Sequence, residues 1–173
     1  MSEERPLRIA TSAAVRERRL ASLLAGRDAH DPRWRWAAQD AQVAGSLALS
    51  GIDVTAAEVA AARSGAPAPP AVQALLRALA AVEPASPLSV EALCRWQAVV
   101  TGGPGALRTG ELERAGGPPP SPARFVEARL RMLEKWLAEE SGRELKPAQQ
   151  GALAMARVVE ILPFPQGNGR VAR

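Results

Sequence analysis

The sequence contains one cysteine, one histidine and no tyrosine. Because the single cysteine, Cys94, has no partner within the chain, an internal disulfide is excluded. No stretch of about 18 apolar residues is free of charge, so we predict no transmembrane helix. The first eight residues carry charges on both sides of Pro6, and no apolar run follows them, which is unlike a secretory signal. These absences favour a cytoplasmic protein that does not enter a membrane.

Lysine and aromatic side chains are also scarce. Only two of the 22 cationic residues are lysines, and aromatic residues make up 3% of the chain. Hydrophobic residues make up 47%, so leucine, valine and alanine must form the core. A chain of 173 residues suits one domain, or one core with a small helical appendage. The arginines are dispersed rather than gathered in a block, so we expect no direct contact with nucleic acid.

The apolar residues recur at helical spacing along almost the whole chain. Asp31 and Pro32 form a helix-start signal, and Thr55 with Glu58 forms a capping box. Strand-like runs are too short to form a sheet, so we predict an all-α fold. The expected helices cover residues 12–24, 31–49, 55–65, 71–82, 89–100, 121–142 and 146–161.

Two proline-rich breaks divide this pattern, at residues 66–70 and 83–87. We place a boundary at the second break, which gives an N-terminal helical region (1–85) and a core (86–173). Residues 101–120 are rich in glycine and proline, which indicates a long loop. Between Gly151 and Leu162 the only charged residues are Arg157 and Glu160, which predicts a buried, central helix there.

The last twelve residues, 162–173, read L-P-F-P-Q-G-N-G-R-V-A-R. Glycines in a tight Gly-Asn-Gly turn let backbone N–H groups approach a ligand closely. A helix starting near Gly169 would point its unpaired N–H groups at the turn, and such an end favours anions. Arg170 and Arg173 would share one face of that helix. This pattern predicts a phosphate site, although a structural turn with exposed arginines would have the same pattern.

This segment resembles the signature of the Fic family, H-P-F-x-[D/E]-G-N-[G/K]-R-x-x-R. Seven of the nine fixed positions match, namely Pro163, Phe164, Gly167, Asn168, Gly169, Arg170 and Arg173. Residues 105–108 resemble the loop that precedes the family motif, 121–140 the helix after that loop, and 42–59 the N-terminal helical region. The resemblance implies a helical bundle with the motif loop between a buried central helix and a following helix. The core would lack the helices expected after the motif, because the sequence ends at Arg173.

The resemblance also implies a pocket that binds ATP and transfers AMP to a hydroxyl of a target protein. It assigns Gly167, Asn168, Gly169, Arg170 and Arg173 to nucleotide binding. In the family, the histidine is the general base and the acidic residue holds Mg²⁺.

The two mismatches fall on these chemical roles. Leu162 replaces the histidine and cannot accept a proton, while a positioned base contributes about 10²–10⁴-fold in rate. Gln166 replaces the acidic residue, and hard cations prefer carboxylates. His30 lies far earlier in the chain, where we expect a surface position. We therefore predict no catalytic residue, no metal ligand, and ATP held weakly or not at all.

Residues 46–51 resemble an inhibitory motif of the family, [S/T]-x-x-x-E-[G/N], whose glutamate pairs with the second motif arginine. Ser50 stands in place of that glutamate and cannot form an ion pair with Arg173. The same residues are also compatible with an ordinary helix end. The loop from Arg108 to Pro118 is short for the target-docking flap of the family.

Three functions remain open at this stage. The first is a degenerate Fic protein that is a poor AMP transferase. The second is an active nucleotide-dependent transferase with altered chemistry. The third is a non-catalytic regulatory or interaction module, which would act through a protein target or a regulatory partner.

Overall fold

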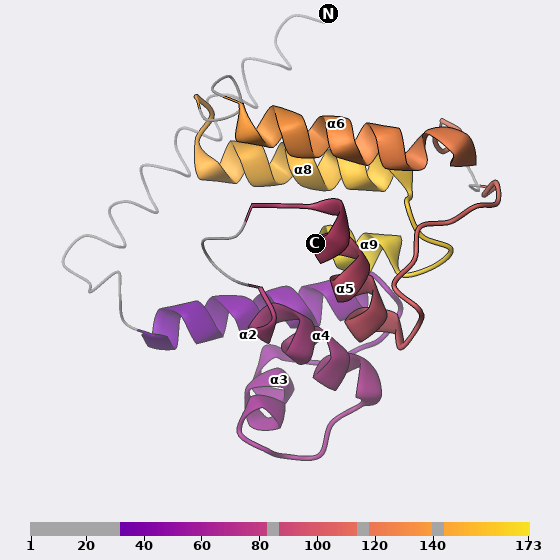
Figure 1. Cartoon of the computed structure of the whole chain (residues 1–173). Helices are drawn as coiled ribbons and strands as arrows, with labels where there is room; N and C mark the ends of the chain where they lie inside the picture. Colours follow the sequence, from indigo (N-terminus) through magenta and orange to yellow (C-terminus); the bar gives the residue numbers. More distant parts are fainter. Residues whose placement is uncertain (1–31, 83–86, 114–117, 140–143) are drawn as a thin grey trace, which may run out of the picture. The chain divides into compact units, whose positions relative to one another are not determined.

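A computed structural model describes residues 32–82, 87–113, 118–139 and 144–173 (Figure 1). The expected helix at residues 12–24, Asp31 and His30 lie outside these ranges. Regular structure within them is helical throughout. The elements are α2 (Pro32–Ala48), α3 (Ala56–Arg63), α4 (Pro70–Ala80), α5 (Val90–Thr101), a 3-10 turn η1 (Ala123–Phe125), α6 (Val126–Ala138), α8 (Pro147–Ile161) and α9 (Asn168–Ala172). The predicted all-α class is confirmed.

The chain divides into two compact units, residues 1–39 and 40–173. The second unit contains nearly all the described elements. The predicted boundary at residue 85 stays a prediction, because residues 83–86 lie outside the described ranges.

Local capping rules predicted several helix ends correctly. The Thr55 hydroxyl accepts a hydrogen bond from the Glu58 N–H, and the Thr55 N–H donates to the Glu58 carboxylate at 2.7 Å. These bonds with Thr55 also hold the pKa of Glu58 below its ordinary value. The Ser89 hydroxyl accepts from the Ala92 N–H at the start of α5, and Gly102 ends that helix in the left-handed region.

Two clusters of buried apolar side chains form the core of the second unit. One joins α2, α3, α4 and the end of α5, through Val43, Leu47, Val59, Ala62, Val72, Leu75, Ala78 and Val100. The other joins α5, α6, α8 and the motif segment, through Val90, Leu93, Val126, Leu130, Leu133, Val158, Ile161, Phe164 and Val171. Helix α5 contributes to both clusters, so it connects the motif segment with the N-terminal helices.

Helix α6 begins later than the sequence predicts. Ser121 does not cap it: the backbone forms the 3-10 turn η1 first, and α6 starts at Val126. The Ser121 hydroxyl instead accepts a hydrogen bond from Arg129 at 2.7 Å. Pro122 precedes η1 with an extended backbone (ψ 140°), which separates Ser121 from the helix by several residues.

Helix α8 runs beside α6 (Figure 1). The predicted burial of this helix applies to its C-terminal half, where Val158 and Ile161 are buried. Further toward its N-terminus, Leu153 and Met155 remain 44% and 41% exposed. An apolar composition therefore did not by itself place the whole helix in the interior.

The loop after α5 is attached closely to that helix at Gly105. Its φ is +66°, and a Cβ there would lie 2.6 Å from the carbonyl oxygen of Cys94. The Gly105 N–H donates to Oε1 of Gln97 at 3.1 Å, and Gln97 is itself buried. A side chain at this position would therefore meet both backbone strain and a clash.

We expect Gly105→Ala to lower the free energy of unfolding by about 3 kcal/mol, because the clash adds to the left-handed strain. Gly102→Ala is the matched control: its φ is +69°, but a Cβ there would meet nothing within 4 Å. The control should cost about 1 kcal/mol, from strain alone. Urea unfolding followed by circular dichroism measures both, and equal losses would contradict the close approach at Gly105.

Candidate functional site

Residues 162–167 form the loop that joins α8 to α9. Leu162 ends α8 with φ 48° and ψ 67°, in the left-handed region. It is the one non-glycine residue with positive φ in the described part of the chain. Pro163 and Phe164 follow and are fully buried, with Phe164 in the core cluster of α5, α6 and α8. The first half of the loop is therefore anchored, whereas Gln166 is exposed.

Asn168 closes this loop through its side chain. Its Oδ1 accepts from the Phe164 N–H at 2.8 Å, and its Nδ2 donates to the Phe164 carbonyl at 2.7 Å. Gly167 precedes it with φ 79°, where a Cβ would lie 2.5 Å from the methyl carbon of Thr101. The amide of Asn168 therefore shapes the turn, and its predicted contact with nucleotide stays a prediction.

The turn leads into α9, which is only five residues long. Five residues cannot sustain a helix in isolation, because helix nucleation is costly. The helix nevertheless forms, because tertiary contacts hold it. Val171 is buried in the core, and Nε2 of Gln42 donates to the Arg173 carbonyl at 2.6 Å.

Arg173 lies over the turn and contacts α2. Its Nε donates to the Ser46 hydroxyl and its Nη2 to the Ser46 carbonyl, both at 3.0 Å. A Cβ on Gly169 would lie 3.2 Å from Nη1 of Arg173, so the missing side chain at Gly169 makes room for the guanidinium. The Ser50 hydroxyl donates to the same Ser46 carbonyl, at 3.1 Å. Ser46 thus holds the side chain of Arg173 on α2, while Gln42 of the same helix binds its backbone carbonyl.

The charges of Arg170 and Arg173 are not neutralised by a carboxylate of the described residues. Arg170 makes only a long hydrogen bond, 3.5 Å from Nη1 to the Val100 carbonyl. Burial, with a smaller contribution from the positive charge of Arg170, lowers the pKa of Arg173 from its ordinary value. Two neighbouring cations that share no counterion are suited to bind an anion with more than one charge.

A small cavity lies next to these arginines. Its volume is about 190 Å³, and its walls come from α2, α4, α5 and α9. Gln42, Ser46, Arg170 and Arg173 supply the polar part of the wall. Leu75, Leu79 and Trp96 are among its apolar residues.

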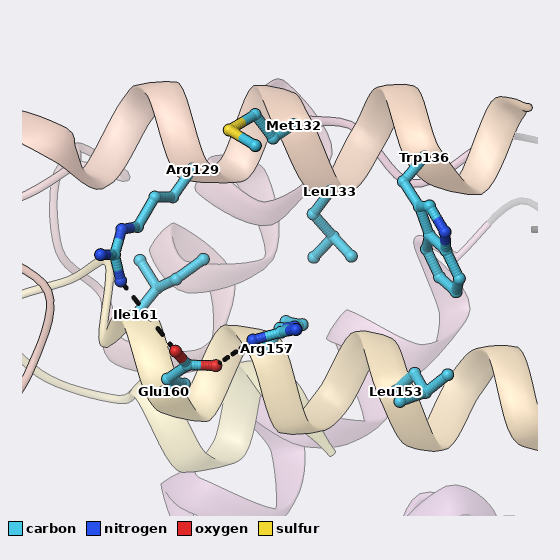
Figure 2. A pocket seen from close by; sticks show the side chains of 8 residues that line it. All are labelled: Arg129, Met132, Leu133, Trp136, Leu153, Arg157, Glu160 and Ile161. Atoms are coloured by element: carbon cyan, nitrogen blue, oxygen red, sulfur yellow. Dashed lines mark hydrogen bonds and ion pairs between the residues drawn. The ribbon is translucent and has the colours of Figure 1, made fainter. Parts of the chain in front are cut away.

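A larger groove of about 790 Å³ lies between α6 and α8 (Figure 2). Glu160 forms ion pairs there with Arg157 at 2.6 Å and with Arg129 at 4.0 Å. Met132, Leu133, Trp136, Leu153 and Ile161 supply apolar walls. Because its arginines already have a carboxylate partner and no motif residue lines it, this groove is the weaker anion site despite its size.

The described residues contain no group of three or more histidine, cysteine, aspartate or glutamate side chains arranged to hold a metal. None of the described helices is long and apolar enough to cross a membrane.

The fold and the motif geometry define an all-helical protein with a Gly-Asn-Gly turn flanked by two arginines. The chain belongs to the Fic/DOC family, whose sequence model matches residues 87–173. It is 35% identical over 69 residues to "Protein adenylyltransferase Fic" of Drosophila melanogaster, a match that covers 40% of this chain and 14% of that protein. The match to "Protein adenylyltransferase fic-1" of Caenorhabditis elegans has the same identity and covers 13% of that protein.

The fold is similar to the solved structure of a fragment of Fic-1 from C. elegans, with a TM-score of 0.69 and 22% sequence identity. That similarity covers 97% of this chain and 58% of the solved chain. The chain thus spans only part of the relatives it matches.

All five residues that the resemblance assigns to the nucleotide lie around one turn: Asn168 closes it, and Gly167, Gly169, Arg170 and Arg173 surround it. The sequence did not indicate Gln42, which binds the Arg173 carbonyl from 131 positions away. The resemblance set residues 46–51 against the second motif arginine, and in the structure Ser46 of that segment accepts the hydrogen bonds of Arg173. The resemblance also placed Arg108 in the loop before the motif, but it did not indicate that this side chain is buried.

Proposed function

We propose that this chain binds the polyphosphate of a nucleotide at Arg170 and Arg173 and is a poor AMP transferase. The pair of guanidiniums without a carboxylate partner in the described residues is the observation that carries the proposal. Arginine is suited to this role, because its several N–H donors match the geometry of phosphate oxygens. The identity of the nucleotide as ATP rests on the names of the relatives, which are protein adenylyltransferases.

Slow transfer follows from residue 162. The alkyl side chain of Leu162 stands where the family motif has its histidine, and it has no atom that can take a proton from an attacking hydroxyl. Without a positioned base, the rate is expected to fall by about 10²–10⁴-fold. The other motif residues, 163–173, have apolar, amide or guanidinium side chains or none, so none of them can act as a base in its place near neutral pH.

The donors of the site fit a polyphosphate but do not fit Mg²⁺. The motif position that is acidic in the family is the exposed amide Gln166, and Mg²⁺ prefers carboxylate ligands. We therefore derive no catalytic step through a metal ion.

Calorimetric titration with ATP tests both parts of the proposal. ATP should bind without Mg²⁺ at least as tightly as with it, because the two arginines neutralise the phosphate charge without help from a metal ion. Gln166→Glu should reverse this order, since the added carboxylate repels the free polyphosphate and can share a cation with it. Absence of ATP binding under both conditions would end the proposal, and a wild-type affinity that depends on Mg²⁺ would overturn the argument about Gln166.

A further inference from the structure

We infer that Arg108 is a positioning residue that holds the motif loop in the form that brings Arg170 and Arg173 together. Arg108 comes from the loop after α5, and its side chain is 2% exposed. Its nearest carboxylate is that of Glu111, at 3.8 Å, and the Glu111 side chain is 70% exposed. The buried guanidinium is therefore held chiefly by backbone carbonyl groups.

Four carbonyl oxygens accept hydrogen bonds from this one side chain. Nε donates to Leu162 at 2.7 Å, Nη2 donates to Ile161 at 3.2 Å and to Ser121, and Nη1 donates to Gly110 at 2.9 Å. The first two acceptors are the last carbonyls of α8, which have no partner within the helix and carry its negative dipole end. One arginine thus joins the end of α8 to the loop before η1.

Two energetic costs coincide at this point. Burying a cation is unfavourable unless its hydrogen bonds are complete, and a leucine in the left-handed region is strained. Leu162 is the strained residue, and its own carbonyl accepts the hydrogen bond from Nε of Arg108 at 2.7 Å. Strain of this kind persists only where surrounding contacts determine the backbone, and it gathers at binding and catalytic sites.

The backbone transmits this constraint to the arginines in three short steps. The Arg108 N–H donates to the Pro163 carbonyl at 2.9 Å. The next residue, Phe164, exchanges two hydrogen bonds with the side chain of Asn168. Asn168 begins α9, the helix that carries both arginines. Moving the carbonyls that Arg108 holds would therefore shift the start of α9.

The loop that carries Arg108 is itself fixed to α5. Gly105 packs on the Cys94 carbonyl and donates to Gln97 from three residues before Arg108. The last turn of the same helix supplies the Val100 carbonyl that accepts from Arg170. Helix α5 thus contacts both the loop that carries Arg108 and Arg170 of the motif.

The test is Arg108→Lys in the whole chain, read by amide hydrogen exchange. Lysine keeps the charge but replaces the planar fork, with its five N–H donors, by a single ammonium group. Exchange in segment 162–169 should rise about tenfold, because hydrogen bonds to a charged group are lost there. Segment 55–63, which belongs to the other core cluster, should be unchanged. Arg131→Lys, an exposed arginine paired with Glu91, is the matched control and should alter neither segment.

Two results would overturn the inference. Unchanged exchange at 162–169 would show that Arg108 does not hold the loop, and an equal rise in both segments would show a general loss of stability. If Arg108→Lys does not fold, Asn168→Ala is the alternative variant. It removes the two hydrogen bonds between Phe164 and the Asn168 side chain, which follow Arg108 in the same series of contacts. This variant should raise amide exchange in segment 168–173 and leave segment 105–113 protected. Loss of protection in both segments would contradict the idea that the constraint runs from Arg108 through Phe164 to Asn168.

The consequence for ligand binding rests on the proposed function. If the wild-type chain binds ATP, Arg108→Lys should weaken the affinity about tenfold. Adding Leu162→Gly should restore part of that loss, because glycine adopts the left-handed conformation without strain. An unchanged affinity would overturn the link to the site. If the wild-type chain binds no ATP, the proposed function fails, and the exchange measurement still decides the role of Arg108.

Discussion

Replacing Leu162 by histidine is expected to raise AMP transfer by about 10²–10⁴-fold, the usual contribution of a positioned general base. The backbone at this position already suits the change. Histidine and asparagine adopt the left-handed region more readily than leucine does, so the substitution should not disturb the loop. Incorporation of label from α-labelled ATP into the proteins of a lysate measures the effect.

Leu162→Asn is the matched control for this gain. Asparagine tolerates the same left-handed backbone, but its amide is no general base. The rate of AMP transfer by Leu162→Asn should therefore stay at the wild-type level. A gain from asparagine equal to that from histidine would mean that relief of strain, and not base catalysis, limits the rate. Wild-type labelling as strong as that of Leu162→His would show that the chain is an active transferase by another route.

Replacing both Arg170 and Arg173 by alanine is expected to weaken ATP binding by more than about 100-fold. Each guanidinium can make charge-assisted hydrogen bonds, which contribute about 1.5–3 kcal/mol each, or roughly 10–100-fold in affinity. Arg173 donates to Ser46 through Nε and Nη2, and Arg170 makes only the long bond to Val100. Among the described residues, Nη1 of Arg173 and the other donors of Arg170 have no hydrogen-bond partner, so they are available to phosphate oxygens. Calorimetric titration at two salt concentrations measures the loss and its electrostatic share.

The control for that variant is Arg77→Ala combined with Arg95→Ala. These exposed arginines lie on α4 and α5, and their removal changes the net charge by the same amount. The affinity of the control should stay within a few-fold of the wild type. An equal loss in both double variants would assign the binding to general charge and not to the motif.

Short-range chemistry explains what the sequence could predict. The ends of α3 and α5 depend on residues three positions apart, as between Thr55 and Glu58, and such pairs are visible in the sequence. The order of helices was predicted on the same local grounds, whereas the role of the motif loop and the two mismatched residues was predicted from the resemblance to the Fic signature.

Long-range contacts explain what the sequence could not predict. Gln42 and Arg173 are 131 positions apart, and Arg108 reaches Leu162 across 54. The resemblance placed Arg108 in the loop before the motif, but nothing in the sequence indicates that its side chain is buried or which carbonyl groups it reaches. The sequence also could not predict that the N-terminal half of α8 is exposed. Its exposure depends on which neighbours pack against that helix and not on its composition.

The position of bound ATP in a crystal of the wild-type chain tests the central claim most directly. We predict the phosphates between the guanidiniums of Arg170 and Arg173, beside the Gly167–Gly169 turn, with an intact nucleotide because no base faces it. A nucleotide seated instead in the groove between α6 and α8, with Arg170 and Arg173 unoccupied, would contradict the account.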